Sequence, residues 1–169
     1  METDEGYDPA VWSQMAEQLG LQSLHIPEEY GGQGFSFVEL AIVLEEMGRV
    51  LLCAPYFSTV VLATGAILNA GSPDDCKALL PGIASGETIA ALAFTEPNGK
   101  WDAAGVTMEA TQSGGNWTLN GTKSFVIDGH VDLRSLARAA LTAALQDSVV
   151  VPLEYHNRLI QFAEFIRDG

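Results

Sequence analysis

Basic side chains are scarce in this sequence, which has eight Lys and Arg residues against 22 Asp and Glu in 169 residues. The formal net charge of −14 argues against a nucleic-acid-binding protein, because such proteins normally carry a basic surface. It argues equally against adsorption to an anionic membrane surface. The apolar fraction of 47% allows a sizeable core, so the chain is expected to fold.

Targeting and membrane-spanning signals are also missing from the sequence. The N-terminus METDEGYDP has neither a basic region nor an apolar run, so no secretory signal is expected. No stretch of about 18 apolar residues occurs, so no transmembrane helix is expected either. The only cysteines, Cys53 and Cys76, have neither a metal-type nor a redox-type spacing and are predicted to be reduced thiols. Together these features predict a cytoplasmic protein.

The first half of the chain has the capping residues and apolar spacing of helices. Asp8 before Pro9 is a typical helix start, and Ser36 with Glu39 has the spacing of a capping box. Pro81, followed by glycine, is predicted to stop the last of these helices. Four helices are expected, over residues 8–19, 36–48, 58–69 and 72–80.

The hydrophobic period changes after residue 87. Thr88–Phe94 is an apolar run of the length of a buried strand, and Val106–Thr111 and Trp117–Leu119 alternate. The glycine-rich stretch 113–116 predicts a hairpin turn between the alternating segments, and Lys123–Ile127 is a further candidate strand. Helices first and strands second predict an α+β fold, an N-terminal all-α helical domain followed by a partial antiparallel β domain.

The composition changes again near residue 131. Residues 1–130 hold 17 acidic and four basic side chains, whereas residues 131–169 hold five acidic and four basic. Leu133–Leu145 and Glu154–Arg167 are expected to be helices, and Val149–Pro152 a short extended segment or a break. The predicted domains are therefore a helical domain at 1–86, a partial β domain at 87–131 and a helical tail of unrelated or rearranged origin at 132–169.

General motif chemistry assigns no metal site and no catalytic residue. His25, His130 and His156 are far apart and lack zinc-ligand spacing, so structural or surface roles are expected. The glycine-rich stretch Gly31–Gly34 precedes a helix, which could indicate a phosphate cradle, but a sharp loop is the favoured interpretation. The adjacent pair Glu45–Glu46 is interpreted as part of a solvated acidic helix face.

Four motifs occur in a fixed order over residues 8–130. They are Gly20–Leu21 with Ile26–Gly34, running on into Val43–Arg49, then Leu80–Glu87, Ala93–Pro97 and Leu119–Lys123. In this order and at these distances they resemble the acyl-CoA dehydrogenase family of flavoenzymes. The resemblance implies an N-terminal α domain followed by a β domain, in agreement with the helix-then-strand pattern.

The resemblance also implies a reaction, an FAD-dependent oxidation of the CH–CH group of an acyl-CoA thioester. In the family a carboxylate removes the α proton, a hydride passes to the flavin, and an electron-transfer flavoprotein takes the electrons. The match fades after Gly129–Val131, before the part of the family that holds the catalytic carboxylate. Neither Glu154 nor Glu164 can be assigned that role, so no catalytic residue is proposed from the sequence.

The family's flavin contacts carry over to two segments of this chain. Phe125 can stack on a flavin, but Ile127 stands where the family usually has a hydroxyl. Trp101 takes the position of a serine that lies near CoA in the family, which departs from ordinary CoA binding. The implied cofactor-binding residues are Leu92, Phe94, Thr95, Phe125, Val126 and Ile127.

Three interpretations follow from the sequence. The chain is a shortened acyl-CoA dehydrogenase homologue that is inactive alone, a non-catalytic interaction subunit of a full-length paralogue, or a non-functional fragment. Association with itself or with a paralogue is expected, because a partial β domain would leave strand edges and apolar surface uncovered.

Overall fold

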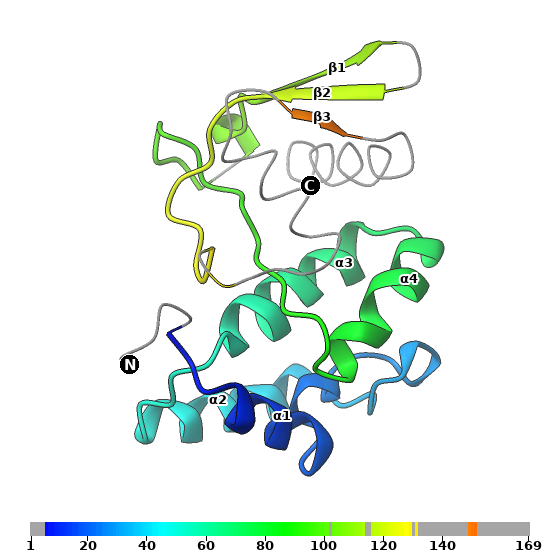
Figure 1. Ribbon diagram of the computed structural model, residues 1–169, viewed down its shortest axis with the longest axis vertical. Helices are drawn as coiled ribbons and strands as arrows, with labels where there is room; N and C mark the ends of the chain where they lie inside the picture. The colour runs from blue at the N-terminus through cyan, green and yellow to red at the C-terminus, as the bar shows by residue number, and fades with distance from the viewer. Residues whose placement is uncertain (1–5, 102, 114–115, 130, 132–148, 152–169) are drawn as a thin grey trace.

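The computed structural model describes residues 6–101, 103–113, 116–129, 131 and 149–151 (Figure 1). Within these ranges helices gather at one end of the molecule and a small sheet lies at the other, joined by extended chain. The helices are α1 (Pro9–Glu17), α2 (Phe37–Arg49), the π-helical segment η3 (Phe57–Ala63), α3 (Thr64–Ala70) and α4 (Pro73–Ala84). Short 3-10 turns are η1 (Leu21–Ser23), η2 (Glu28–Tyr30) and η4 (Ala103–Gly105), and the strands are β1 (Glu109–Ser113), β2 (Asn116–Asn120) and β3 (Val149–Val151).

The predicted helix starts of α1 and α2 are confirmed. The Asp8 carboxylate accepts a 2.8 Å hydrogen bond from the amide of Ala10. Ser36 and Glu39 form the expected capping box, in which the Ser36 hydroxyl accepts from the amide of Val38 and the Glu39 carboxylate accepts from the amide of Ser36. Each cap satisfies amide groups that a helix start leaves unpaired.

The helix predicted over 58–69 is confirmed, but its first part is wound as a π-helix. The amide and the hydroxyl of Thr64 both donate to the carbonyl oxygen of Thr59, five residues earlier, which is the π-helical spacing. Ser58, Thr59 and Thr64 are fully buried, so these polar side chains need hydrogen-bond partners inside the protein.

The prediction that Pro81 ends the last helix is wrong, because α4 continues to Ala84 with Pro81 inside it. Proline lacks the amide donor and its ring crowds the carbonyl four residues earlier, but the next turn still closes, because the amide of Ser85 donates to the Pro81 carbonyl at 3.0 Å. The extra turn buries Ile83 and Ala84 in the core. Burial of that apolar surface offsets the cost of the interior proline.

Two clusters of buried side chains form the core of the helical part. One joins α4 to the loop before η2 and to the extended segment, and it contains Ile26, Ala63, Cys76, Leu80, Ile83, Ala84 and Ala90. The other lies between α1, α2 and η3, and it contains Trp12, Met15, Leu24, Leu40, Tyr56 and Val60. Hydrogen bonds from buried polar tips support the packing: the Trp12 indole donates to the Gly86 carbonyl at 2.9 Å and the Tyr56 hydroxyl to the Leu21 carbonyl at 2.7 Å.

The predicted hairpin is confirmed by the antiparallel pairing of β1 with β2, in which Ala110 lies opposite Leu119. Strand β3 pairs with the other edge of β2, so the predicted extended segment at 149–151 is confirmed as well. The two hairpin turn residues at 114–115 lie outside the described residues, as do the helices expected at 133–145 and 154–167.

Two further strand predictions are wrong within the described part of the chain. Residues 88–94 and 123–127 are extended or irregular and pair with no strand there. In the first segment the Thr59 side chain binds both backbone groups of Ala90, in place of a neighbouring strand. In the second, Phe125 has φ +55°, which turns the chain out of a strand conformation.

No helix in the described ranges is long and apolar enough to cross a membrane. In the same ranges no group of three or more His, Cys, Asp and Glu side chains is placed to hold a metal ion. The predicted domain boundaries at 86 and 131 stay predictions.

Candidate functional site

The two segments that the resemblance singles out lie side by side in the structure. The amide of Ser124 donates a 2.8 Å hydrogen bond to the carbonyl of Thr95, and the ammonium of Lys123 lies 3.3 Å from the carbonyl of Phe94. These contacts bring residues 92–96 next to residues 123–127, although about 30 residues of chain separate them. The candidate site is therefore built from the extended chain between the helices and the hairpin (Figure 1).

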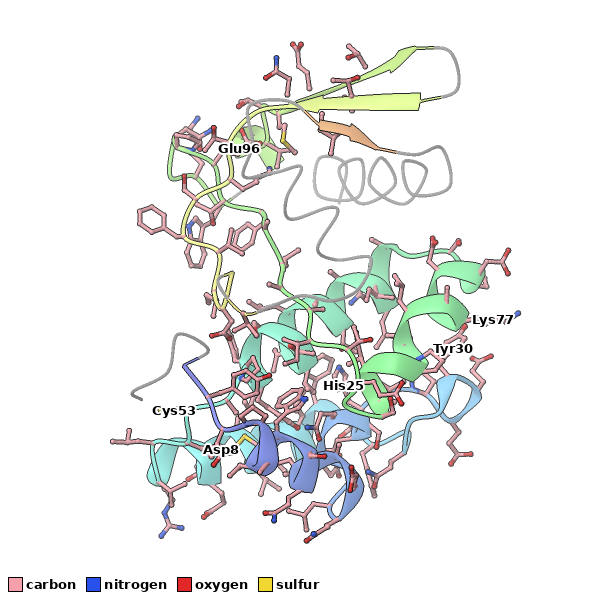
Figure 2. All side chains as sticks on the ribbon, in the orientation of Figure 1. Asp8, His25, Tyr30, Cys53, Lys77 and Glu96 are labelled. Atoms are coloured by element: carbon pink, nitrogen blue, oxygen red, sulfur yellow. The ribbon has the colours of Figure 1, made fainter. Side chains whose placement is uncertain are left out.

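A buried ion pair fixes one end of this site. Lys123 Nζ lies 2.7 Å from Glu96 Oε1, and the two side chains are 6% and 3% exposed. The Glu96 carboxylate also accepts hydrogen bonds from the amides of Thr107 and Met108 and from the Thr107 hydroxyl. Figure 2 labels Glu96 near the sheet, where the two segments and the chain leading into β1 converge.

The environment of Glu96 keeps its carboxylate ionised. Burial by itself would raise the pKa, but the hydrogen bonds from Lys123, Thr107 and Met108 outweigh it and lower the pKa to about 2. A carboxylate with so low a pKa is a weak base. Glu96 therefore ties three segments together and is not a candidate for proton abstraction.

Sequence reasoning did not single out Glu96 and Lys123 as site residues. Both belong to the motifs Ala93–Pro97 and Leu119–Lys123 that carry the family resemblance. The sequence did contain a signal for this pair, because each of the two motifs has a single charged residue, and the two charges are of opposite sign. A buried charge in such a place normally has a partner of opposite sign.

Apolar side chains are exposed along the two segments. Phe125 is 87% exposed and Trp101 is 79% exposed, and the Trp101 ring packs edge-on against Phe94 with ring centroids 5.5 Å apart. Ile127 is also exposed, whereas Thr95 is buried. Leu92, Phe94 and Val126 are half-buried.

The opposite end of the site is attached to the helical part. The Ser58 hydroxyl donates to Asp128 Oδ2 at 2.6 Å, and the Thr59 hydroxyl donates to the carbonyl of Ala90 at 2.9 Å and accepts from its amide at 3.1 Å. Neighbouring residues of η3 thus hold one segment just before Leu92 and the other just after Ile127.

Residues 1–87 match the family described as acyl-CoA dehydrogenase, N-terminal domain. This chain belongs to the acyl-CoA dehydrogenase family. A 38% identical relative over 111 residues is the probable acyl-CoA dehydrogenase FadE25 of Mycobacterium tuberculosis, and the match covers 65% of this chain and 28% of FadE25. The chain therefore spans less than a third of the length of that relative.

Two solved structures share the fold of the matched part. The ChsE4-ChsE5 complex of Mycobacterium tuberculosis superposes with a TM-score of 0.63 at 30% identity, over 74% of this chain and 33% of that chain. An acyl-CoA dehydrogenase complexed with FAD from Bacillus anthracis superposes with a TM-score of 0.61 at 30% identity, over 69% of this chain and 20% of that chain. The family match ends at residue 87, before Leu92, the first of the predicted cofactor-binding residues, so the roles of Leu92 to Ile127 stay predictions.

The glycine-rich stretch Gly31–Gly34 forms the predicted sharp loop, and its interior is filled by protein. Gly31 and Gly34 have positive φ, and the amide of Gly34 donates to the carbonyl of Ile26 at 2.9 Å. A Cβ atom on Gly32 would lie 1.8 Å from that same carbonyl oxygen. A carbonyl oxygen inside the loop repels anions, so the structure gives no support to a phosphate cradle.

The other residues considered from the sequence have structural or surface positions. His25 is buried against Phe37, with ring centroids 5.3 Å apart, and burial lowers its pKa. Glu45 and Glu46 are exposed on α2, so the predicted solvated face is confirmed. Cys76 is a buried thiol and is not bonded to Cys53. His130 and His156 lie outside the described residues.

Proposed function

We propose that this chain provides one wall of the flavin site of an acyl-CoA dehydrogenase. The observation that carries the proposal is the 2.8 Å hydrogen bond between Ser124 and Thr95, which aligns two segments with exposed apolar side chains. The matching structure from Bacillus anthracis contains FAD, and the two segments hold the residues that the family resemblance assigns to flavin binding.

The residues present fit the apolar part of a flavin. Phe125 offers a free aromatic face for stacking, and Ile127 adds apolar surface beside it. Ile127 cannot donate the hydroxyl hydrogen bond that is usual in the family, so the proposed contacts on this segment are mainly apolar. Leu92, Phe94, Thr95 and Val126 complete the proposed cofactor-binding set. When bound, FAD supplies a hydride acceptor for the oxidation of a carbon–carbon single bond.

The described residues provide no free carboxylate at either end of the two segments. Glu96 is held by Lys123, Thr107 and Met108, and Asp128 accepts the hydrogen bond of Ser58. Because α-proton removal needs an available base, we propose that the chain is inactive alone. The base then comes from a partner, for which a full-length acyl-CoA dehydrogenase subunit has suitable chemistry.

The proposed substrate is an acyl-CoA thioester, with an electron-transfer flavoprotein as the electron acceptor of the assembled enzyme. Trp101 replaces the family serine near CoA, and its ring is packed against Phe94. A large exposed ring at this position narrows the approach to the site. Trp101 is therefore proposed as a substrate-contacting residue that alters how CoA binds.

A flavin titration tests the proposal. Purified chain mixed with FAD is expected to quench flavin fluorescence, and addition of an acyl-CoA is expected not to bleach the 450 nm flavin band unless a partner is present. Phe125→Ala is expected to weaken FAD binding about ten-fold, the size of one lost aromatic stack. The matched control is Phe35→Ala, an exposed phenylalanine in the helical part. Equal FAD affinity of the Phe125 and Phe35 variants would contradict the proposed site.

The second candidate function is a non-catalytic interaction subunit. It is favoured by apolar side chains exposed on the first two turns of α2, namely Phe37, Val38 and Ile42. One of the similar structures is a complex of two named chains, ChsE4 and ChsE5. Co-purification of a colourless chain with an acyl-CoA dehydrogenase, abolished by Ile42→Glu, would support this function over the first. A chain that binds neither FAD nor such a partner would be a non-functional fragment.

A further inference from the structure

Two neighbouring polar residues, Ser58 and Thr59, lie at the start of the π-helical segment η3 and are completely buried. Both are bonded to groups far along the chain. Thr59 binds Ala90, 31 residues away, and Ser58 binds Asp128, 70 residues away. Local irregularities of this type occur often at functional sites. Here the π-helical winding places two consecutive hydroxyls toward the two segments of the candidate site.

The Thr59 hydroxyl acts as a substitute strand partner for Ala90. It donates to the Ala90 carbonyl at 2.9 Å and accepts from the Ala90 amide at 3.1 Å. Both backbone groups of this buried residue are thereby satisfied. Ala90 precedes Leu92 by two residues, so the first segment is fixed where it enters the proposed flavin site.

Asp128 lies at the third position of a turn that closes the second segment. The amide of Gly129 donates to the carbonyl of Val126 at 3.2 Å, and Asp128 has φ +56°. A positive φ at this turn position favours glycine or asparagine. The chain has aspartate there, and its carboxylate accepts a short 2.6 Å hydrogen bond from Ser58.

The same segment contains a second residue in the left-handed region. Phe125 has φ +55°, which is unfavourable for an aromatic side chain and persists only where the surroundings fix it. Ser124 is held on one side of Phe125 by the carbonyl of Thr95, and Asp128 is held on the other side by Ser58. Phe125, Val126 and Ile127 thus lie on a short span of chain with an anchor at each end.

We propose that Ser58 and Asp128 form a positioning pair that sets the conformation of residues 125–127 for flavin binding. The inference rests on the proposed FAD site. The pair does not contact the cofactor itself. It acts through the backbone of the turn at residues 126–129, which holds Phe125 in its strained conformation.

The geometry also allows the positioning role to be separated from a role in folding. Ser58 Oγ lies 3.1 Å from the carbonyl of Pro55 as well as 2.6 Å from Asp128. If the carboxylate is removed, the buried hydroxyl still has an acceptor inside the helical part. Glycine at position 128 tolerates φ +56°, so Asp128→Gly removes the hydrogen bond without adding backbone strain.

The test compares FAD affinity and thermal stability in four variants of the whole chain: Asp128→Gly, Asp128→Asn, Ser58→Ala and the double variant Ser58→Ala with Asp128→Gly. Asp128→Gly is expected to raise the Kd for FAD about ten-fold, with a small change in Tm. Asp128→Asn keeps an acceptor and tolerates the left-handed region, so its Kd is expected to stay within about three-fold of the unmodified chain. The double variant is expected to bind FAD no more weakly than Asp128→Gly, because the two substitutions remove the same hydrogen bond between Ser58 and Asp128.

A second readout needs no flavin. Hydrogen exchange of the backbone amides at 125–129 is expected to speed up in Asp128→Gly and Ser58→Ala, and to return toward the original rate in Asp128→Asn. Amides of α1 serve as the internal control and are expected to be unchanged. If one variant does not fold, the other tests the same hydrogen bond from its opposite partner.

The outcomes separate this inference from the proposed function. If the unmodified chain binds FAD and Asp128→Gly binds it with the same affinity, the positioning pair is overturned and the flavin site remains. Lack of FAD binding by the unmodified chain would overturn the proposed function, and the positioning role toward a flavin with it. Weakened binding in Asp128→Asn as large as in Asp128→Gly would also contradict the pair, because the shared hydrogen bond would then not be the cause.

Discussion

Lys123 and Glu96 form an ion pair that is almost completely removed from solvent, with 2.7 Å between Nζ and Oε1. The pair joins the motif Ala93–Pro97, which precedes the hairpin, to the motif Leu119–Lys123, which begins at the end of β2. If Lys123 is replaced by methionine, Glu96 is left as a buried charge without its counter-ion. Lys123→Met is therefore expected to destabilise the protein by about 3–5 kcal/mol.

Urea unfolding at neutral pH measures this loss. Lys100→Met is the matched control, because Lys100 is an exposed lysine on the same part of the chain. The control is expected to change the free energy of unfolding by less than about 0.5 kcal/mol. A loss below about 1 kcal/mol for Lys123→Met would mean that water reaches the pair.

Glu96 also predicts an acid-sensitive contribution to stability. Its pKa is about 2 in the folded protein, against an ordinary value of 4.5. Because the unfolded chain takes up the proton first, the contribution is present above about pH 5 and is lost as the pH falls from 4.5 towards 2. Its upper limit is about 3 kcal/mol.

Unfolding free energies of the original chain and of Glu96→Gln, measured between about pH 3 and pH 6, test this linkage. The original chain is expected to lose stability more steeply with acid than the variant. Glu45→Gln, a change at an exposed carboxylate of α2, is the control and is expected to keep the original slope. Parallel curves for the original chain and Glu96→Gln would contradict the assigned pKa.

The features that sequence reasoning predicted correctly depend on residues close together in the chain. The capping groups of Asp8 and of the Ser36–Glu39 pair act within three residues, so their chemistry can be read directly from the sequence. The same holds for the turn signal between β1 and β2. The family motifs supplied the two segments of the site, because each motif is also local.

The predictions that failed depended on contacts between distant residues. Pro81 is unfavourable inside a helix, but burial of Ile83 in the core extends α4 beyond it. The strand expected at 123–127 is prevented by the positive φ of Phe125, which no local rule assigns to a phenylalanine. Glu96 and Lys123 are 27 residues apart in the sequence, so their pairing can be recognised only from the three-dimensional structure.

His25 predicts a second dependence of stability on pH. The ring is buried, and within the described residues neither ring nitrogen has a hydrogen-bond partner. Burial lowers its pKa below the ordinary 6.5, so the unfolded state binds a proton more readily than the folded state. Stability is therefore expected to be full above pH 6.5 and to fall as the pH drops below it.

His25→Leu tests this expectation, because it replaces the titrating ring with an apolar side chain of similar size. The variant is expected to lose the pH dependence that sets in as the pH falls below 6.5. At pH near 7.5 it is expected to be at least as stable as the original chain, because it removes two buried nitrogen atoms that have no partner in the described part of the chain. A variant that is less stable at neutral pH would show that the ring nitrogens have partners, such as ordered water.

Gly31 and Gly32 are adjacent in the loop at Gly31–Gly34, but a side chain is excluded at the two positions for different physical reasons. At Gly32 a Cβ atom would lie 1.8 Å from the carbonyl oxygen of Ile26, which is itself held by the amide of Gly34. At Gly31 a Cβ atom would meet nothing within 4 Å, and only its φ of +85° opposes a side chain. Gly32→Ala is therefore expected to lower the free energy of unfolding by more than about 3 kcal/mol, because the backbone must move, and Gly31→Ala by about 1–2 kcal/mol.

Urea unfolding of both variants measures the difference in their free energies of unfolding. Equal losses would mean that the loop opens without disturbing Ile26. A larger loss for Gly32→Ala would place the cost in the contact between the loop and the core of the helical part, where Ile26 is buried.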